Sequence, residues 1–345
     1  MKCHHARFLP LALFALLSAP LAAHPLDEAN IWVYETPQAR PAAPVAKIRR
    51  VAEPPAPGDA AASFIDGNAT WSISLGYRRE TIDYNIAGAG GVPNIVSELK
   101  WKTDMAELRV DFDWEGDEGF VAEMDLAHAT AFDGRNRDSD YLYDNRRGEF
   151  SRSYAKVDGS SATRLSAGVG WRFDPFARVS FKPMLGYAYQ EHDMRMRHGV
   201  LVIDTVYGDL GRFHGLDSHY RPSWRGPWLG LRIDAQPTER FAFNISAKRQ
   251  WFKLRADSTW NLRGDLAQPT THRQKGDSYG WQLGMGAAWW LTPERALTLR
   301  LDQQMLRLRR GDRYYYPASG GRGRTDLNEV NLDSWSAAVG YQQRF

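Results

Sequence analysis

The sequence predicts an all-β fold, a ten-stranded antiparallel transmembrane β-barrel. Apolar and polar residues alternate along about ten segments between Thr70 and the C-terminus. Successive side chains of a strand point to opposite faces, so each segment has one face suited to lipid and one suited to a polar interior. Short turns and longer polar loops alternate between the segments, and the last residue, Phe345, is aromatic. A β-sandwich, the competing fold, would not explain a lipid-like face on every strand.

The first segment, residues 1–23, has the composition of a secretory signal peptide. Two basic residues precede an apolar run over residues 8–17, and small residues then lead to a cleavage point after Ala23. The run is shorter than the roughly 17–25 residues that a membrane-spanning helix needs. The one cysteine, Cys3, lies in this segment, so the mature chain is predicted to form no disulfide.

Residues 24–66 form a second segment, which is rich in proline and alanine. This composition predicts a flexible extension in the periplasm. The barrel domain is predicted to cover residues 67–345. The signal peptide removes two of the 44 basic residues, which leaves 42 against 41 acidic residues. This near balance gives no electrostatic argument for a nucleic-acid partner.

Ten strands are predicted in order, each from an apolar residue at every second position. Their apolar faces begin, in chain order, at Trp71, Leu108, Phe120, Leu165, Val179, Leu229, Phe241, Tyr279, Leu297 and Trp335. The strands lie near residues 70–87, 94–114, 119–132, 151–173, 178–196, 224–235, 240–260, 277–291, 296–311 and 329–345.

The connections between the strands alternate in length. Tight turns are predicted at residues 115–118, 174–177, 236–239 and 292–295, and long loops near residues 133–150, 197–223, 261–276 and 312–328. In membrane barrels the short turns face the periplasm and the long loops face outward. Several strands exceed the roughly 9–11 residues that cross a bilayer. We therefore expect the barrel to rise well above the outer leaflet, with both termini in the periplasm.

The final strand carries Trp335, Val339 and Tyr341 on the same face as Phe345, opposite small or polar residues. Gln343 alone departs from this apolar face. The strand is similar to the C-terminal signature of bacterial outer-membrane barrels. The resemblance implies a place in the bacterial outer membrane, with lipid and lipopolysaccharide as neighbours. It also implies that the barrel-assembly machinery recognises the strand ending at Phe345.

The predicted inward face of the strands carries charges of both signs. These residues are Arg78, Asp111, Asp113, Glu123, Asp125, Arg172, Lys182, Arg232, Asp234, Lys248, Arg300 and Asp302. The mixture predicts a network of ion pairs. Side chains just fill a barrel of about eight strands, whereas wide aqueous channels need about 16–18. The sequence therefore argues against a general diffusion porin and leaves limited permeation open.

One pair of residues is a candidate for catalysis. Asp138 and Asp140 lie two residues apart on an extended rim, so their carboxylates point the same way and could share a proton or position a water. The alternative is a solvated polar loop. The sequence has no phosphate-binding loop, no G-x-S-x-G motif and no H-E-x-x-H motif. No metal site and no cofactor are predicted, with lipopolysaccharide as the one ligand under consideration.

The chain from about residue 70 to residue 345 resembles the omptins, outer-membrane endoproteases that cleave near basic residues. Residues 97–102 (Ser-Glu-Leu-Lys-Trp-Lys) are similar to the omptin sequence Ser-Gln-Leu-Asp-Trp-Lys. Asp138 and Asp140 fall where omptins carry a pair of catalytic aspartates. Residues 85–88 and 93–101 resemble more closely the Protochlamydia outer-membrane protein family, an omptin-like group with some members regarded as porins.

Omptins also carry a second dyad, Asp-x-His, near the outer end of the seventh strand, with the histidine as base. Asp257 matches the aspartate of that dyad, but Thr259 stands where histidine is required. Loss of a general base typically lowers a rate about 10²–10⁴-fold. His272, in the following loop, is the candidate substitute.

The leading hypothesis is an omptin-like outer-membrane barrel that is not a protease and has a surface-binding, structural or limited-permeation role. The alternative is a divergent omptin-type aspartic endoprotease that uses Asp138, Asp140, Asp257 and His272. Basic and aromatic residues are also candidates for binding lipopolysaccharide phosphates, with a solvated rim as the alternative. These residues are Arg195, Arg197, Arg221, Trp224 and Arg225.

Overall fold

The computed structural model describes residues 67–206, 208 and 210–345. The predicted signal peptide (1–23) and the extension (24–66) lie outside the described residues and stay predictions. Within the described part, no helix is long and apolar enough to cross a membrane. That part is built almost entirely of β-strands, as the alternating sequence pattern predicts.

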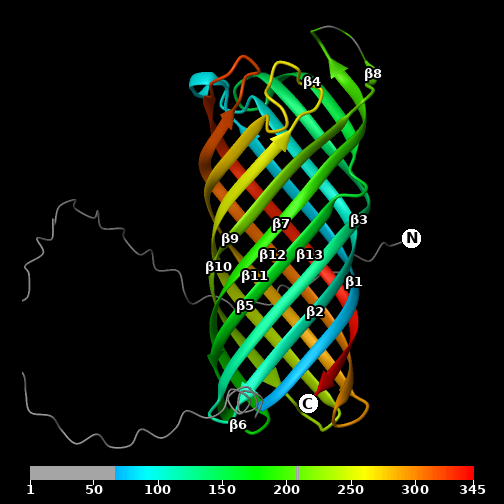
Figure 1. Ribbon diagram of the computed structural model, residues 1–345, viewed down its shortest axis with the longest axis vertical. Coiled ribbons are helices and arrows are strands. Elements are labelled where there is room, and N and C mark those ends of the chain that lie inside the picture. Colours follow the sequence, from blue (N-terminus) through cyan, green and yellow to red (C-terminus); the bar gives the residue numbers. More distant parts are fainter. Residues whose placement is uncertain (1–66, 207, 209) are drawn as a thin grey trace, which may run out of the picture. The chain divides into compact units, whose positions relative to one another are not determined.

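The strands form the wall of a tall cylinder (Figure 1). In chain order they are β1 (Gly67–Ile86), β2 (Ser97–Gly116), β3 (Phe120–Tyr143), β4 (Arg147–Lys156), β5 (Ser161–Trp171), β6 (Phe173–Phe176), β7 (Val179–Asp204), β8 (Gly211–Arg212), β9 (Asp217–Ala235), β10 (Phe241–Thr259), β11 (His272–Trp290), β12 (Arg295–Tyr315) and β13 (Gly323–Arg344). A short 3-10 helix, η1 (Ala89–Gly91), follows β1.

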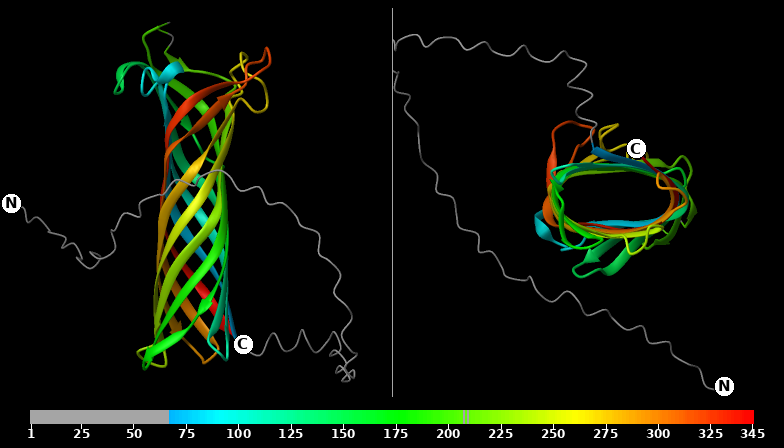
Figure 2. Two further views of the ribbon diagram at one scale, coloured as in Figure 1. Left: turned by 90° about the vertical axis from the view of Figure 1, so that its left-hand side faces the viewer. Right: turned by 90° about the horizontal axis from the view of Figure 1, so that it is seen from below.

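Neighbouring strands pair antiparallel and close into a ring (Figure 2, right). β4 and β5 together occupy one position in the wall, because β5 pairs with the first part of β3 and β4 with its last part. β6 and β8 are short additions that pair with β7. β1 and β13 close the ring, with pairs from Thr70↔Arg344 to Ile86↔Leu327. The ring has 10 antiparallel strands, which confirms the predicted barrel. Closure pairs the backbone groups of the wall, as lipid requires.

The two ends of the barrel differ, as predicted. One end, called the turn end, holds the short connections, such as residues 117–119 and 291–294, together with Phe345. The other, called the loop end, holds the connections at residues 87–96, 144–146, 205–216, 260–271 and 316–322. These loops are shorter than predicted because the strands continue into them. β7 alone is 26 residues long.

β-Bulges explain why the sequence pattern hid the ends of the strands. In β3, Asp133 pairs with Asp104 and Ala131 with Met105, so Phe132 is left over. A bulge adds one residue and reverses which later side chains face inward. A second irregularity, at Arg309 and Arg310, has the same effect on β12. The prediction that residues 133–150 and 312–328 are loops was wrong for most of each range.

Two belts of aromatic side chains mark the part of the outer surface that faces lipid. Near the turn end, the rings of Phe241 and Trp289 stack at 6.1 Å. Farther along, Tyr77 and Trp335 lie 5.3 Å apart, and Trp251 of β10 lies opposite Tyr279 of β11. Ten residues separate Phe241 from Trp251, roughly 33 Å along a strand. A tilt of about 35–45° reduces that span to roughly 25 Å, the height of an outer-membrane apolar band. We call this region the lipid band.

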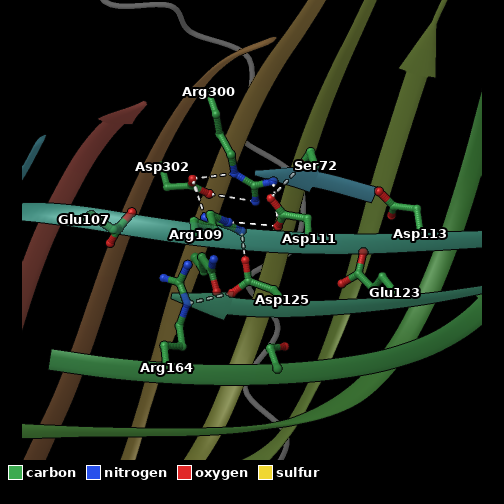
Figure 3. Close-up of polar contacts among 12 residues, drawn as sticks. Ser72, Glu107, Arg109, Asp111, Asp113, Glu123, Asp125, Arg164, Arg300 and Asp302 are labelled. Atoms are coloured by element: carbon green, nitrogen blue, oxygen red, sulfur yellow. Dashed lines mark hydrogen bonds and ion pairs between the residues drawn. The ribbon is translucent and has the colours of Figure 1, made fainter. Parts of the chain in front are cut away.

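Inside the lipid band lies a network of ion pairs, which we call the charged cluster (Figure 3). Its centre is Arg109, which bonds Asp302 at 3.0 Å and Asp111 at 2.9 Å and also pairs with Asp125. Arg164 bonds Asp125 from the far side. The network of paired inward charges is thus confirmed. Arg109, its most connected member, was absent from the predicted set of inward charges, although it alternates with Leu108 and Val110 as Asp111 does with Val110 and Phe112.

Above the lipid band, the interior changes from charged to apolar. Eleven side chains there have no exposed surface and belong to one cluster, which we call the apolar layer. They are Ile82, Trp101, Val157, Met194, Tyr220, Trp224, Ala256, Leu306, Leu308, Leu327 and Leu332. Trp101 stacks on Tyr220 at 4.9 Å between ring centroids. Solvent reaches these side chains from neither end of the barrel.

Candidate functional site

The predicted aspartate pair lies at the loop end, above the apolar layer. Asp138 and Asp140 belong to β3 rather than to a loop, and they pair across to Leu99 and Ser97 of β2. Leu99 is buried, so both carboxylates lie on the inward face at the barrel mouth. The sequence therefore predicted correctly that the two carboxylates point the same way.

The environment of the pair disfavours two negative charges. Burial, together with the neighbouring carboxylate of Asp140, raises the pKa of Asp138 well above its usual value. Burial also raises the pKa of Asp140. The Ser97 side chain and the more distant Arg313 guanidinium favour the ionised forms, but burial has the larger effect. One oxygen of Asp138, Oδ1, is buried with no hydrogen-bond partner in the described structure. The pair is thus suited to holding a shared proton.

His272 lies on the inward face of a different part of the wall. It begins β11, where the sequence predicted a loop, and it is buried. Its Nδ1 lies 3.1 Å from Thr271 Oγ1. Burial and the positive charges of Arg313 and Arg263 lower the pKa of His272 to about 2. The ring is therefore a neutral imidazole with little affinity for a proton.

His272 and the two aspartates lie on opposite walls of the mouth. β3 and β11 lie five positions apart in a ring of 10 strands, which places them on opposite sides. In the described residues, no hydrogen bond or ion pair joins His272 to Asp138 or Asp140. The charge of Arg313 nevertheless acts on His272 and on both aspartates, so the three residues face the same mouth without a direct bond between the histidine and the pair.

Asp257 lies on the outer surface of the wall. Its neighbours Ala256 and Ser258 are buried on the inward face, so Asp257 must point outward. Its Oδ1 bonds Arg273 Nε at 2.6 Å, and Arg255 is a second partner. The resemblance implied that Asp257 joins the catalytic set, whereas the structure places it on the other side of the sheet from Asp138, Asp140 and His272.

One of the candidate lipopolysaccharide contacts is misplaced. Trp224 has no exposed surface and belongs to the apolar layer, with its ring 5.4 Å from that of His192. Arg195 and Arg221 do face outward, but each is paired with an aspartate. Arg225 is exposed and has no ion pair among the described residues. The prediction was wrong for Trp224 because burial of its indole was not visible in the local sequence.

Sequence reasoning also missed Arg313, which faces the mouth. It pairs with Gln274 of β11 and Thr325 of β13, and its Nε is buried without a hydrogen-bond partner in the described structure. The irregularity at Arg309 and Arg310 turns this residue inward. Two adjacent arginines that interrupt an alternating pattern are the signal that a bulge occurs there.

Comparison with known proteins agrees with this architecture. A family model described as Protochlamydia outer membrane protein matches residues 72–345. The chain belongs to this family. Its members are outer-membrane proteins, so this barrel lies in the outer membrane, with the loop end facing outward by the rule for short turns and long loops. No curated protein sequence matches the chain.

Solved structures show what the fold is similar to. The outer-membrane protease OmpT from Escherichia coli matches with a TM-score of 0.69 and 14% identity, over 81% of this chain and 98% of that chain. The translocator domain of the autotransporter NalP from Neisseria meningitidis matches with a TM-score of 0.36 and 14% identity, over 83% and 93% of the two chains. At 14% identity, the first match establishes a shared fold and no shared activity.

Proposed function

We propose that this outer-membrane barrel works by binding at its extracellular surface, and that it neither cleaves peptides nor conducts solutes. The observation that carries the proposal is the apolar layer, whose eleven side chains occupy the lumen with no exposed surface. A barrel closed in this way has its outer wall and its mouth available for contacts with other molecules.

Two successive barriers oppose permeation. An ion entering from the periplasm would first meet the charged cluster, where Arg109 and its carboxylate partners already satisfy one another. It would then have to enter the apolar layer, where loss of water costs an ion several kcal/mol. A solute entering from outside would pass Asp138, Asp140 and Arg313 at the mouth and would then meet the apolar layer.

The placement of the candidate catalytic residues opposes proteolysis. Asp257 lies on the outer face, and His272 is a weak base on the wall opposite the aspartate pair. The inward positions of β10 near its end carry Ala256 and Ser258, neither of which can act as a carboxylate or imidazole base.

The aspartate pair keeps an aspartic hydrolase as the second candidate function. Asp138 and Asp140 share the inward face of β3, and the raised pKa of each favours a shared proton. Such a dyad can activate a water without a histidine. This candidate needs only Asp138 and Asp140 and is independent of Asp257 and His272.

Two assays on the full chain, refolded in detergent with lipopolysaccharide, test the proposal. In planar bilayers we expect no stepwise conductance, and with a quenched peptide containing Arg-Arg and Arg-Lys bonds we expect no cleavage. Heat-modifiable mobility on gels verifies that the barrel is folded. Stepwise conductance would overturn the closed-barrel proposal. Cleavage that disappears in Asp138→Ala/Asp140→Ala would establish the hydrolase instead.

We extend the proposal to lipopolysaccharide as a neighbour of the outer wall. The guanidinium of Arg249 lies 5.2–5.8 Å from the ring centres of Trp251, Tyr279 and Trp281, at the upper aromatic belt. A cation at that level suits the phosphates of a lipid headgroup. We expect lipopolysaccharide to raise the melting temperature of the wild type more than that of Arg249→Gln. An equal increase would contradict this contact.

The last strand supports a role for the barrel-assembly machinery. Trp335 and Val339 face lipid, and Phe345 is exposed at the turn end. We expect deletion of Phe345 to reduce the amount of folded barrel in the outer membrane of living cells, with little effect on refolding in detergent. A normal amount in cells would argue against recognition of this residue.

A further inference from the structure

The outer wall of the extracellular part contains a cavity lined by basic side chains, which we call the basic pocket. It has a volume of about 580 Å³ and lies beside β4, the last part of β7 and the short strand β8. Figure 1 labels β4 and β8 at the loop end. Its lining includes Arg135, Lys156, Arg197, His198, Arg212 and His214. No aspartate or glutamate is among the lining residues, all of which are described.

Three of these residues lie directly opposite one another on adjacent strands. Arg135 of β3 pairs with Lys156 of β4, which pairs with Arg197 of β7. On the other side of Arg135, the row continues to Lys102 of β2. Like charges placed directly opposite on a sheet destabilise the pairing. Four cations in a row therefore lower the stability of the empty barrel.

The basic pocket also lacks counter-charges from nearby loops. Within the described part of the chain, Arg135, Lys156 and Arg212 have no ion pair at all. Asp217, directly opposite Arg197, hydrogen-bonds Arg195 at 2.6 and 3.0 Å and attracts Arg197 only through its charge. Arg135, Lys156 and Arg212 thus hold positive charge at the pocket without an ion pair from this part of the chain, and Arg197 shares the charge of Asp217 with Arg195.

The backbone around the basic pocket is shaped to hold these side chains. The ring of Phe213 packs over Gly199 so closely that a Cβ there would lie 2.0 Å from the ring. Gly159 leaves space for the Arg197 guanidinium, with Nη2 3.4 Å from where a Cβ would be. The Nε of Arg197 is buried and has no hydrogen-bond partner in the described structure. The Nε–H group of Arg197 is therefore a hydrogen-bond donor at the pocket that has no acceptor in the described structure.

A second cavity on the wall shows that an excess of positive charge is not a general property of the outer surface. It has a volume of about 730 Å³ and lies on β11, β12 and β13. Its charged lining is mixed, because Asp277, Asp312 and Asp326 accompany four basic residues. Arg324 bonds Asp312 there at 2.7 Å. The wall balances its charges at this second cavity and leaves them unbalanced at the basic pocket.

We propose that the basic pocket binds a sugar carrying several phosphate or sulfate groups. This inference rests on the surface-binding function proposed above and names its ligand class. Guanidinium forks and ammonium groups bond tetrahedral oxyanions through several charge-assisted hydrogen bonds. A volume of about 580 Å³ suits one or two sugar rings, since small-ligand sites are typically about 300–1,000 Å³. Tyr154 and Phe213 supply apolar surface for the ring carbons.

Calorimetric binding of inositol hexakisphosphate to the full chain, refolded in neutral detergent without lipopolysaccharide, tests the site. The pocket variant is Lys156→Gln/Arg197→Gln. The matched control is Arg309→Gln/Arg310→Gln, which removes the same charge from exposed positions on the opposite wall. We expect wild type and control to bind equally and the pocket variant to bind at least about tenfold more weakly, the effect of losing one to two charge-assisted bonds.

Thermal unfolding adds a second readout. Without the probe, the pocket variant should melt at or above the wild-type temperature, because opposed like charges are removed. With the probe, the wild type and the control should gain stability and the pocket variant should not. Absence of probe binding, or an equal loss of affinity in both variants, would overturn the proposal.

Competition identifies where the oxyanions come from. Displacement of the probe by lipopolysaccharide with a phosphorylated core would assign the site to the cell's own surface. Displacement by a sulfated oligosaccharide alone would assign it to a molecule from outside. Conductance or peptide cleavage would overturn the proposed function while leaving probe binding intact. If the barrel neither conducts nor cleaves the peptide and also fails to bind the probe, this inference alone would be overturned.

Discussion

The two halves of the barrel have opposite polarity. In the lipid band, leucines such as Leu75 and Leu185 face outward, and the charged cluster around Arg109 lies inside. Above the band, ion pairs such as Arg307–Asp333 lie on the outside, and the apolar layer lies inside. The same wall is thus inside-out in its lower half and ordered like a water-soluble protein in its upper half.

This contrast indicates that each half is stabilised by a different solvent. The lower half exposes its apolar side chains to lipid, so its polar interior must be held together by ion pairs that satisfy one another. The upper half removes apolar side chains from water, at roughly 25 cal/mol per Å² buried. The strands run without interruption from the lipid-facing half to the water-facing half. The position of the boundary between the two halves can therefore be tested by substitution.

The largest effect is expected in the charged cluster. Arg109→Gln removes the cation shared by Asp111, Asp125 and Asp302 and leaves these three carboxylates with only Arg164 and Arg300 as partners. Breaking a buried ion pair typically costs about 3–5 kcal/mol. Urea unfolding in detergent micelles measures the loss, with Lys253→Gln as the control. The Lys253 ammonium is exposed, so the unfolding midpoint of Lys253→Gln should match that of the wild type. Equal midpoints for both variants would show that the cluster contributes no stability.

The next largest effect is expected in the apolar layer. Leu306→Ala removes a fully buried side chain that contacts neither lipid nor bulk water. Large-to-small substitutions of this kind cost about 2–5 kcal/mol. The loss should be similar in detergents of different chain length, because lipid does not touch this residue. A loss that depends on the detergent would place Leu306 in the lipid-dependent half.

A somewhat smaller effect should locate the boundary on the outer surface. Leu75 is 65% exposed on the face toward lipid, and Val202 is 42% exposed above the upper aromatic belt. An arginine in the middle of the band costs about 2–4 kcal/mol and little near the interfaces. Unfolding of Leu75→Arg in lipid vesicles should show that loss, and Val202→Arg should not. Similar losses in the two variants would mean that the lipid band is drawn incorrectly.

The smallest effect is expected at the mouth and depends on pH. Because the folded-state pKa of Asp138 is raised above 3.8, the folded barrel binds this proton more tightly than the unfolded chain does. That stability is fully present below pH 3.8 and is lost as pH rises through the raised pKa. Asp138→Asn should therefore stabilise the barrel at neutral pH, by about 1.4 kcal/mol for each unit by which the folded-state pKa is raised. In acid, where the aspartate is protonated in both states, the substitution should change the stability little. A stability change independent of pH would contradict the raised pKa.

The sequence predicted the lower half of the barrel better than the upper half. In the lipid band, alternation runs unbroken, so residues such as Leu165 and Phe241 were assigned correctly to the outer face. Above it, the bulge at Phe132 and the irregularity at Arg309 reverse the phase. Local pattern then no longer tells inside from outside.

The candidate site was predictable only in part, for the same reason. Asp138 and Asp140 lie on one strand after one bulge, so their spacing alone predicts their shared face. The partners of a site come from other strands, and sequence spacing gives no information on them. Asp257 and His272 were matched by position along the chain, but the side each occupies depends on the phase of β10 and β11. The basic pocket likewise arises from register between three strands.

The apolar layer also has a consequence for how the molecule reaches its final state. Its members come from different sides of the wall, including the neighbouring strands β1 and β13 and the more distant β7, so the layer forms only when the ring of strands is closed. Before that moment, the same side chains are carried through the bilayer as separate segments. Afterwards, pulling any strand back would expose them to water one by one. The apolar layer therefore opposes withdrawal of any strand, which makes insertion of the finished barrel effectively irreversible.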